Sequence, residues 1–132
     1  MAYFPSVTNC KQLTINSNTQ LDYPYSVTEG NVAVTDIFDI TVTAPNIKVF
    51  LPDASETTPG FSVTFNNVGT NDFSVVLYDR TTVLNTVAVG EFKTFYVYDV
   101  TTSNGNWRII KAGDGQSGIS NLVVKSTDES VT

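Results

Sequence analysis

The sequence predicts a small all-β domain, an antiparallel β-sandwich or jelly-roll-like fold with an extended N-terminal arm. Apolar and polar residues alternate in short runs, most clearly within residues 39–53, and a period of two is typical of strands with one buried face. Pro45-Asn46 and Pro52-Asp53 interrupt these runs, and proline cannot donate a hydrogen bond within a sheet. No stretch shows the longer apolar period of a helix of ordinary length.

The strands follow one another from about residue 31 to residue 112, the range that we expect to fold as one domain. The first two clear strands are predicted from alternating apolar residues: Ile40 and Val42 in the first strand, and Ile47, Val49 and Leu51 in the second. The remaining predicted strands cover residues 61–66, 73–78, 83–89, 92–100 and 106–110.

Two turns carry stronger local signals than the rest. Asp53 and Glu56 have the spacing of a helix N-cap pair, but Pro59-Gly60 leaves room for a single turn only. Asn104-Gly105 predicts a type I′ hairpin, because that turn needs positive φ at both central residues. The returning strand then places Trp107 on the face that the hairpin buries, against the strand that begins at Phe61.

The two ends of the chain differ from the middle in composition. Residues 1–30 are rich in Asn, Ser, Thr, Tyr and Pro, and their apolar residues come singly. We therefore expect an extended arm that another surface must order, with one short strand at residues 12–16; a plain disordered terminus is the alternative. Residues 113–132 begin with a Gly-rich linker and continue as the start of a C-terminal extension. The candidate attachment residues of the arm are Tyr3, Phe4, Leu13, Ile15, Leu21, Tyr23 and Tyr25.

The charge balance excludes several partners. The chain has 132 residues, with 7 Lys and Arg against 13 Asp and Glu, and a net charge of −6. Its few cations are scattered, whereas nucleic-acid binding needs a concentrated basic patch. The same argument disfavours an anionic membrane surface. No apolar run reaches the roughly 18 residues of a membrane-spanning helix, and the start of the chain lacks the features of a signal peptide.

The residue inventory also limits the chemistry. The chain has no histidine and a single cysteine, which removes Ser-His-Asp triads, zinc sites built on His, and intrachain disulfides. Cys10 is interpreted as a buried or half-buried apolar residue. The acidic residues lie beside turns, where Asp commonly bonds its own backbone, and no calcium-binding loop pattern is present. We predict no catalytic residue, no cofactor and no metal.

The aromatic residues allow two interpretations. Phe50, Tyr78, Tyr96, Tyr98 and Trp107 could form a platform on which a sugar stacks. Alternatively, they belong to the core and to a contact between subunits, because apolar side chains on both faces of a small sheet are usually covered. We favour the second interpretation, with Phe50, Tyr78, Tyr96 and Tyr98 as candidate interface residues.

One order of motifs resembles a known group of proteins. The pieces occur in sequence from residue 40 to residue 110, and only their order carries specificity. They are ITVTAP (40–45), IKVFLPDAS (47–55), PGFSVTFNNVG (59–69), FSVVLYD (73–79), GEFKTFYVYD (90–99) and NGNWRII (104–110). Together they resemble the small β domains of tailed-bacteriophage fibre and virion decoration proteins.

The resemblance implies a structural protein rather than an enzyme. Such domains are often trimeric and serve as adaptors in the virion, so it implies a homotrimer that binds other phage virion proteins after synthesis in the host cytoplasm. A tail fibre or tail-associated adaptor, attached by its N-terminal arm, is the leading hypothesis. The alternatives are a capsid decoration or head fibre protein and a soluble carbohydrate-binding module, and a host-surface glycan is the less favoured partner.

Overall fold

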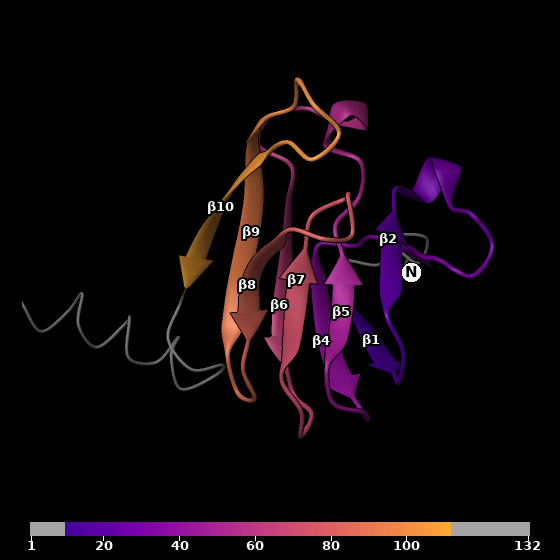
Figure 1. Ribbon diagram of the computed structural model, residues 1–132, viewed down its shortest axis with the longest axis vertical. Helices are drawn as coiled ribbons and strands as arrows, with labels where there is room; N and C mark the ends of the chain where they lie inside the picture. The colour runs from indigo at the N-terminus through magenta and orange to yellow at the C-terminus, as the bar shows by residue number, and fades with distance from the viewer. Residues whose placement is uncertain (1–9, 112–132) are drawn as a thin grey trace, which may run out of the picture.

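The computed structural model describes residues 10–111, and these residues form two facing sheets of five strands each (Figure 1). The first sheet has the order β1-β4-β6-β9-β10, and the second has the order β3-β2-β5-β7-β8. Short 3₁₀ helices lie at Pro24–Ser26 and Ala54–Glu56. The strands are β1 Cys10–Ile15, β2 Thr19–Asp22, β3 Val32–Ala33, β4 Ile37–Val42, β5 Ile47–Phe50, β6 Ser62–Asn67, β7 Phe73–Val76, β8 Val83–Val87, β9 Phe92–Asp99 and β10 Asn106–Lys111.

The chain passes back and forth between the two sheets. We call one strand of the first sheet and the following strand of the second sheet a rung, and β1–β2, β4–β5 and β6–β7 form successive rungs. Cys10 lies beside Ile37, and Ile37 lies beside Thr64, a spacing of 27 residues at both steps. The rungs therefore stack in register, as in a short β-solenoid.

This connectivity corrects the predicted antiparallel pairing. Five of the eight strand pairings among the described residues are parallel, and only β6–β9, β7–β8 and β9–β10 are antiparallel. In the stacked rungs, β4–β6 and β5–β7 run parallel because one strand of the other sheet lies between the two partners along the chain. Alternation of apolar residues shows which face of a strand is buried but not its direction. All-β is confirmed, whereas antiparallel is wrong.

The predicted arm is also corrected, for residues 10–30. β1 pairs with β4 through six residues, and β2 lies between β3 and β5. Leu21 is fully buried and Tyr23 is 5% exposed within this chain alone. Isolated apolar residues suffice here because a strand added to an existing sheet needs to bury only its inward side chains. Strands on both sides of Gly30 therefore belong to the same two sheets. Residues 1–9 and 112–132 lie outside the described residues.

Aromatic rings from both sheets form the centre of the core. Phe38 and Phe65 are register partners on β4 and β6, and their rings stack with centroids 5.8 Å apart. Phe65 also meets Phe95 of the first sheet and, across the interior, Phe73 of the second, each edge to face. Edge-to-face geometry is a favourable arrangement for ring pairs. The two sheets therefore share one core.

The predicted placement of Trp107 is confirmed. The indole is 8% exposed, belongs to the shared core, and meets the ring of Phe61 edge to face at 6.2 Å. Its Nε1 donates a hydrogen bond to the carbonyl oxygen of Asn104 at 2.9 Å. Trp107 therefore ties the β9–β10 loop to the interior.

The loop itself differs from the predicted type I′ turn. β9 ends at Asp99 and β10 begins at Asn106, so six residues connect them. Gly105 has a φ of 65°, but Asn104 is not among the described non-glycine residues with positive φ, which are Asn46 and Arg80. A side chain at position 105 would meet Cβ of Ala54 at 2.5 Å. Glycine is therefore required at position 105 by its surroundings as well as by its backbone angle.

Candidate functional site

The β7–β8 loop of the same chain covers the part of the outer face of the second sheet that surrounds Phe50. Phe50 points outward from β5, yet it is only 6% exposed. The guanidinium of Arg80, in the loop, lies 5.0 Å from the centre of the Phe50 ring. A cation from the same chain stacks over the Phe50 ring, so little of this ring is left for the subunit contact that the sequence predicted.

A buried glutamine holds this cover in place. Gln20 of β2 is 5% exposed and is the register partner of Phe50. Its Oε1 accepts a hydrogen bond from Nε of Arg80 at 3.2 Å, and its Nε2 donates to the carbonyl oxygens of Leu21 and Leu51 at 2.8 and 3.0 Å. The amide is thus satisfied at both ends, as a buried polar group should be.

The outer face of the first sheet carries aromatic residues that no loop within residues 10–111 covers in a comparable way. On β9 and β10, Tyr96 lies beside Arg108, and Thr94 lies beside Ile110. Tyr98 is 44% exposed and Ile110 is 55% exposed. The Arg108 guanidinium stacks on the Tyr98 ring at 4.0 Å, and a hydrogen bond with Tyr96 raises the pKa of Arg108 above its ordinary value. We call Phe92, Tyr96, Tyr98, Arg108 and Ile110 the aromatic strip.

The fourth predicted interface residue lies elsewhere. Tyr78 is 39% exposed and follows the end of β7, in the second sheet. It lines a small hollow with Asp22, Pro52 and Asp53 among others. The structure therefore brings Tyr96 and Tyr98 together and places Tyr78 apart from them.

The predicted attachment residues are spread between core and surface. Leu13 and Ile15 pack against the core from β1, whereas Leu21 and Tyr23 lie inside it. Burial raises the pKa of Tyr23 well above its ordinary value. Tyr25 is 73% exposed, stacks on Tyr23 with ring centres 5.8 Å apart, and donates from its hydroxyl to the carbonyl oxygen of Glu56 at 2.7 Å. Tyr3 and Phe4 lie outside the described residues.

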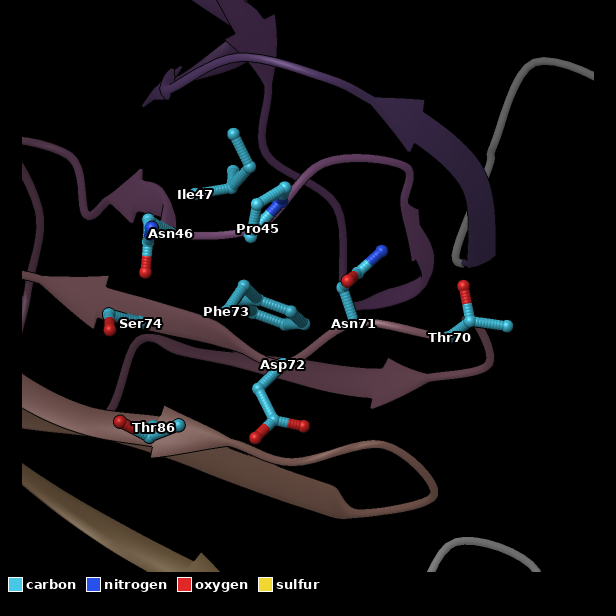
Figure 2. A pocket seen from close by; sticks show the side chains of 9 residues that line it. All are labelled: Pro45, Asn46, Ile47, Thr70, Asn71, Asp72, Phe73, Ser74 and Thr86. Atoms are coloured by element: carbon cyan, nitrogen blue, oxygen red, sulfur yellow. The ribbon is translucent and has the colours of Figure 1, made fainter.

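A polar hollow of about 480 Å³ opens at the end of the second sheet that carries the β4–β5 and β6–β7 turns (Figure 2). Asn46 lies on one side, Ser74 in the middle, and Asp72 with Thr86 on the other side. Asn46 directly precedes β5, Ser74 lies on β7 and Thr86 lies on β8, so these three residues follow the order of the strands in the sheet. The residues that line it are Pro45, Asn46, Ile47, Thr70, Asn71, Asp72, Phe73, Ser74 and Thr86.

Hydrogen bonds fix the floor of this polar hollow. Asn71 donates from Nδ2 to the carbonyl oxygen of Val42 at 2.8 Å, and Oδ1 of Asp72 accepts from the backbone N–H of Val89 at 2.9 Å. Asn67, 1% exposed, donates to the carbonyl oxygens of Asn71 and Val87, both at 3.0 Å. The turns around the hollow are thus held rigidly from inside the domain.

The described residues contain few other features that indicate chemistry. Residues 10–111 hold no group of three or more side chains suited to bind a metal ion. Within the same range, no helix has the length and apolar character needed to cross a membrane. Cys10 is exposed on β1, which corrects its interpretation as a buried or half-buried residue. It lies on β1, the edge strand of the first sheet as residues 10–111 form it.

Comparison with known proteins returned no match for this chain, whether against protein families, curated proteins or solved structures.

Two features were missed by reasoning from sequence. The polar hollow combines residues from β5, β7, β8 and their turns, and no local motif marks it. The stacking of rungs had a weak signal, since the runs TQLDYP, KVFLPD and SVVLYD recur where the chain crosses the second sheet. A search for repeats with a spacing near 27 residues could have detected it.

Proposed function

We propose that this chain is a structural protein of a bacteriophage virion, most specifically a tail fibre or tail-associated adaptor that works as a homotrimer. The order of motifs between residues 40 and 110 supports the class of protein. The two facing sheets would serve as a compact, sandwich-like body that transmits force between other virion components. A capsid decoration or head fibre protein is the alternative location for the same body.

The aromatic strip is the observation that carries the trimer proposal. Tyr98 and Ile110 are both exposed, and they lie on one face of adjacent strands. On the second sheet, the outward ring of Phe50 is covered by Arg80 from a loop of the same chain. Another copy of the chain is the partner that we propose for the strip.

The chemistry of the strip suits a contact between copies. Tyrosine and arginine are enriched at protein interfaces, where they combine a large contact area with hydrogen-bonding groups. Removing apolar surface from water contributes about 25 cal/mol per Å², so several rings per subunit offset part of the cost of association. Cyclic symmetry would bring the strips together around one axis.

Labelled electron microscopy tests the location. An antibody raised against the purified protein would be applied to intact phage particles from the source culture. Gold label along the tail or at its tip supports the leading proposal, whereas label over the head supports the decoration alternative. Particles that carry no label, although the same antibody detects the protein in the infected cells, would contradict a virion role.

The polar hollow favours one second candidate, a carbohydrate-binding module. Amide and hydroxyl groups from Asn46, Thr70, Ser74 and Thr86 line it with a single carboxylate, from Asp72. Neutral polar groups and one acceptor suit a ligand with many hydroxyls, and the described lining has no cation to attract an anion. Phe73 is only 2% exposed, so little stacking would add to the affinity.

Amide chemical-shift titration tests this candidate. Methyl glucoside, methyl galactoside and N-acetylglucosamine would be added separately to isotopically labelled protein. Saturable shifts confined to residues around Asn46 and Ser74, and lost in Asp72→Ala, would support binding at the hollow. An absence of saturable shifts with all three sugars would remove this candidate, and shifts at the aromatic strip would move the sugar site there.

A further inference from the structure

The only Asn-Gly pair of the sequence, Asn104-Gly105, is fastened to another loop by its side chain. Oδ1 of Asn104 accepts a hydrogen bond from the backbone N–H of Asp79 at 2.9 Å, and its Nδ2 donates to Oδ2 of Asp79 at 3.1 Å. We call these two bonds the clasp. They join the β7–β8 loop to the β9–β10 loop, at the end of the domain opposite the polar hollow (Figure 1).

Asp79 is itself held in a fixed orientation. Its Oδ1 accepts from the backbone N–H groups of Thr81 and Thr82, both at 2.9 Å, and its Oδ2 accepts from the hydroxyl of Thr82 at 2.7 Å. These bonds, those from Thr82 above all, hold the pKa of Asp79 well below its usual range. The carboxylate is thus charged at neutral pH and remains an acceptor for the amide of Asn104.

An Asn-Gly pair has a well-defined spontaneous reaction. The backbone nitrogen of the glycine loses its proton and attacks Cγ of the asparagine. A new C–N bond closes a five-membered succinimide, and the side-chain amide leaves as ammonia. Water then opens the ring at either carbonyl and gives aspartate or isoaspartate. No oxidant and no enzyme are needed, and the small glycine leaves its backbone nitrogen open to this approach.

We propose that Asn104 is a latent site of this succinimide modification, which the clasp to Asp79 holds unreactive in the folded protein. Every reacting group is engaged in the structure. Both side-chain atoms of Asn104 bond to Asp79, its carbonyl oxygen accepts from Trp107, and the N–H of Gly105 donates to Oγ1 of Thr102 at 3.0 Å. Cγ cannot turn toward the nitrogen of Gly105 until the clasp opens.

The reaction would then prevent the clasp from re-forming. A carboxylate at position 104 cannot donate to Asp79, and two like charges would face each other. Isoaspartate also lengthens the backbone, next to a glycine whose Cβ position is already occupied by Ala54. The β7–β8 loop, which carries Arg80 over Phe50, would lose one of its anchors. A transient opening would thus become permanent.

Mass spectrometry of the full chain tests this inference. Protein would be incubated at mildly alkaline pH, folded and in concentrated urea, and conversion at Asn104 followed by peptide mapping. The folded protein should react roughly tenfold more slowly than the unfolded one, the population ratio expected when net hydrogen bonds of ordinary strength must break first. Asp79→Ala should raise the folded rate toward the unfolded rate, and Thr102→Ala should raise it less.

Asp39→Ala is the matched control, since it removes an acidic residue from β4, outside both loops that the clasp joins, and it should leave the rate at Asn104 unchanged. Circular dichroism at the incubation temperature would establish that each variant is folded. Equal rates in folded and unfolded wild-type protein would overturn the proposal, and so would a folded Asp79→Ala that reacts as slowly as wild type. If Asp79→Ala does not fold, the Thr102→Ala rate decides.

Discussion

The outer faces of the two sheets both carry aromatic side chains, but within residues 10–111 a loop covers the ring on the second sheet only. On the second sheet, Arg80 lies over Phe50 and leaves it 6% exposed. On the first sheet, Arg108 lies over Tyr98 and leaves it 44% exposed. An arginine stacked on an aromatic ring therefore forms part of the fold in one place and remains open to a partner in the other.

The difference comes from what each arginine is anchored to. Arg80 is in a loop, has a φ of 66°, and bonds the buried amide of Gln20. Arg108 is on β10, at the edge of the first sheet, and its neighbours are the surface residues Tyr96 and Tyr98. An aromatic ring on an outer face thus indicates an interface only after the loops that could reach it are known.

The largest expected loss of stability comes from a substitution on the inner face of the first sheet. Trp107→Ala should lower the free energy of unfolding by about 3 to 5 kcal/mol, because it removes a large buried ring and leaves a cavity. Urea unfolding followed by circular dichroism measures this. A midpoint equal to that of the wild type would contradict the placement of Trp107 in the core.

The next largest loss of stability is expected when Arg80, which covers Phe50 on the second sheet, is replaced. Arg80→Ala exposes Phe50 and leaves Oε1 of Gln20 without its partner, and we expect a loss of about 1 to 3 kcal/mol. Arg80→Lys is the matched variant, since it keeps the charge but lacks the planar group that bonds and stacks, and it should recover only part of the loss. Full stability in Arg80→Ala would show that the loop does not stabilise this face.

The free energy of unfolding should also depend on pH at the alkaline end, because the phenol of Tyr23 is buried in the core. The pKa of Tyr23 is raised in the folded state, so the fold favours the neutral phenol. Its contribution is complete below the ordinary tyrosine pKa of about 10 and is lost as the pH rises above that value. The urea midpoint should therefore fall more steeply above pH 10 in wild type than in Tyr23→Phe. Parallel curves would contradict the burial of Tyr23.

The smallest effect on stability is expected at the uncovered face. Arg108→Ala removes a side chain that only stacks on an exposed ring and bonds a surface hydroxyl, so the thermal midpoint of the dilute protein should not change measurably. Arg80→Ala provides the contrast in the same assay. A comparable loss in both variants would remove the distinction between the two faces.

Much of the fold could be predicted from local pattern, because burial on one face of a strand leaves a period of two in the sequence. The strands that became β6 to β10 and the inward position of Trp107 were predicted in this way. Strand direction was not, since it depends on which sheet the chain enters next. The role of residues 10–30 was missed because Leu21 and Tyr23 are buried by strands that come later in the sequence.

The candidate site could be predicted less well. Tyr96 and Tyr98 alternate with buried Phe95 and Val97, so their outward direction follows from the pattern. Phe50 also alternates with buried residues, so the sequence pattern alone predicts that it is exposed. Only the contact with Arg80, thirty positions away, shows that it is covered. The polar hollow requires three separate segments to meet, which no single stretch of sequence records.

Sedimentation equilibrium of the full chain, compared with a Tyr98→Ser/Ile110→Ser variant, tests most directly whether the uncovered face is a contact between copies. The wild type should sediment as a trimer at micromolar concentration. The variant should sediment as a monomer and, by circular dichroism at low concentration, retain the fold of the wild type. A wild type that is monomeric under these conditions, or a double variant that remains trimeric, would contradict the account.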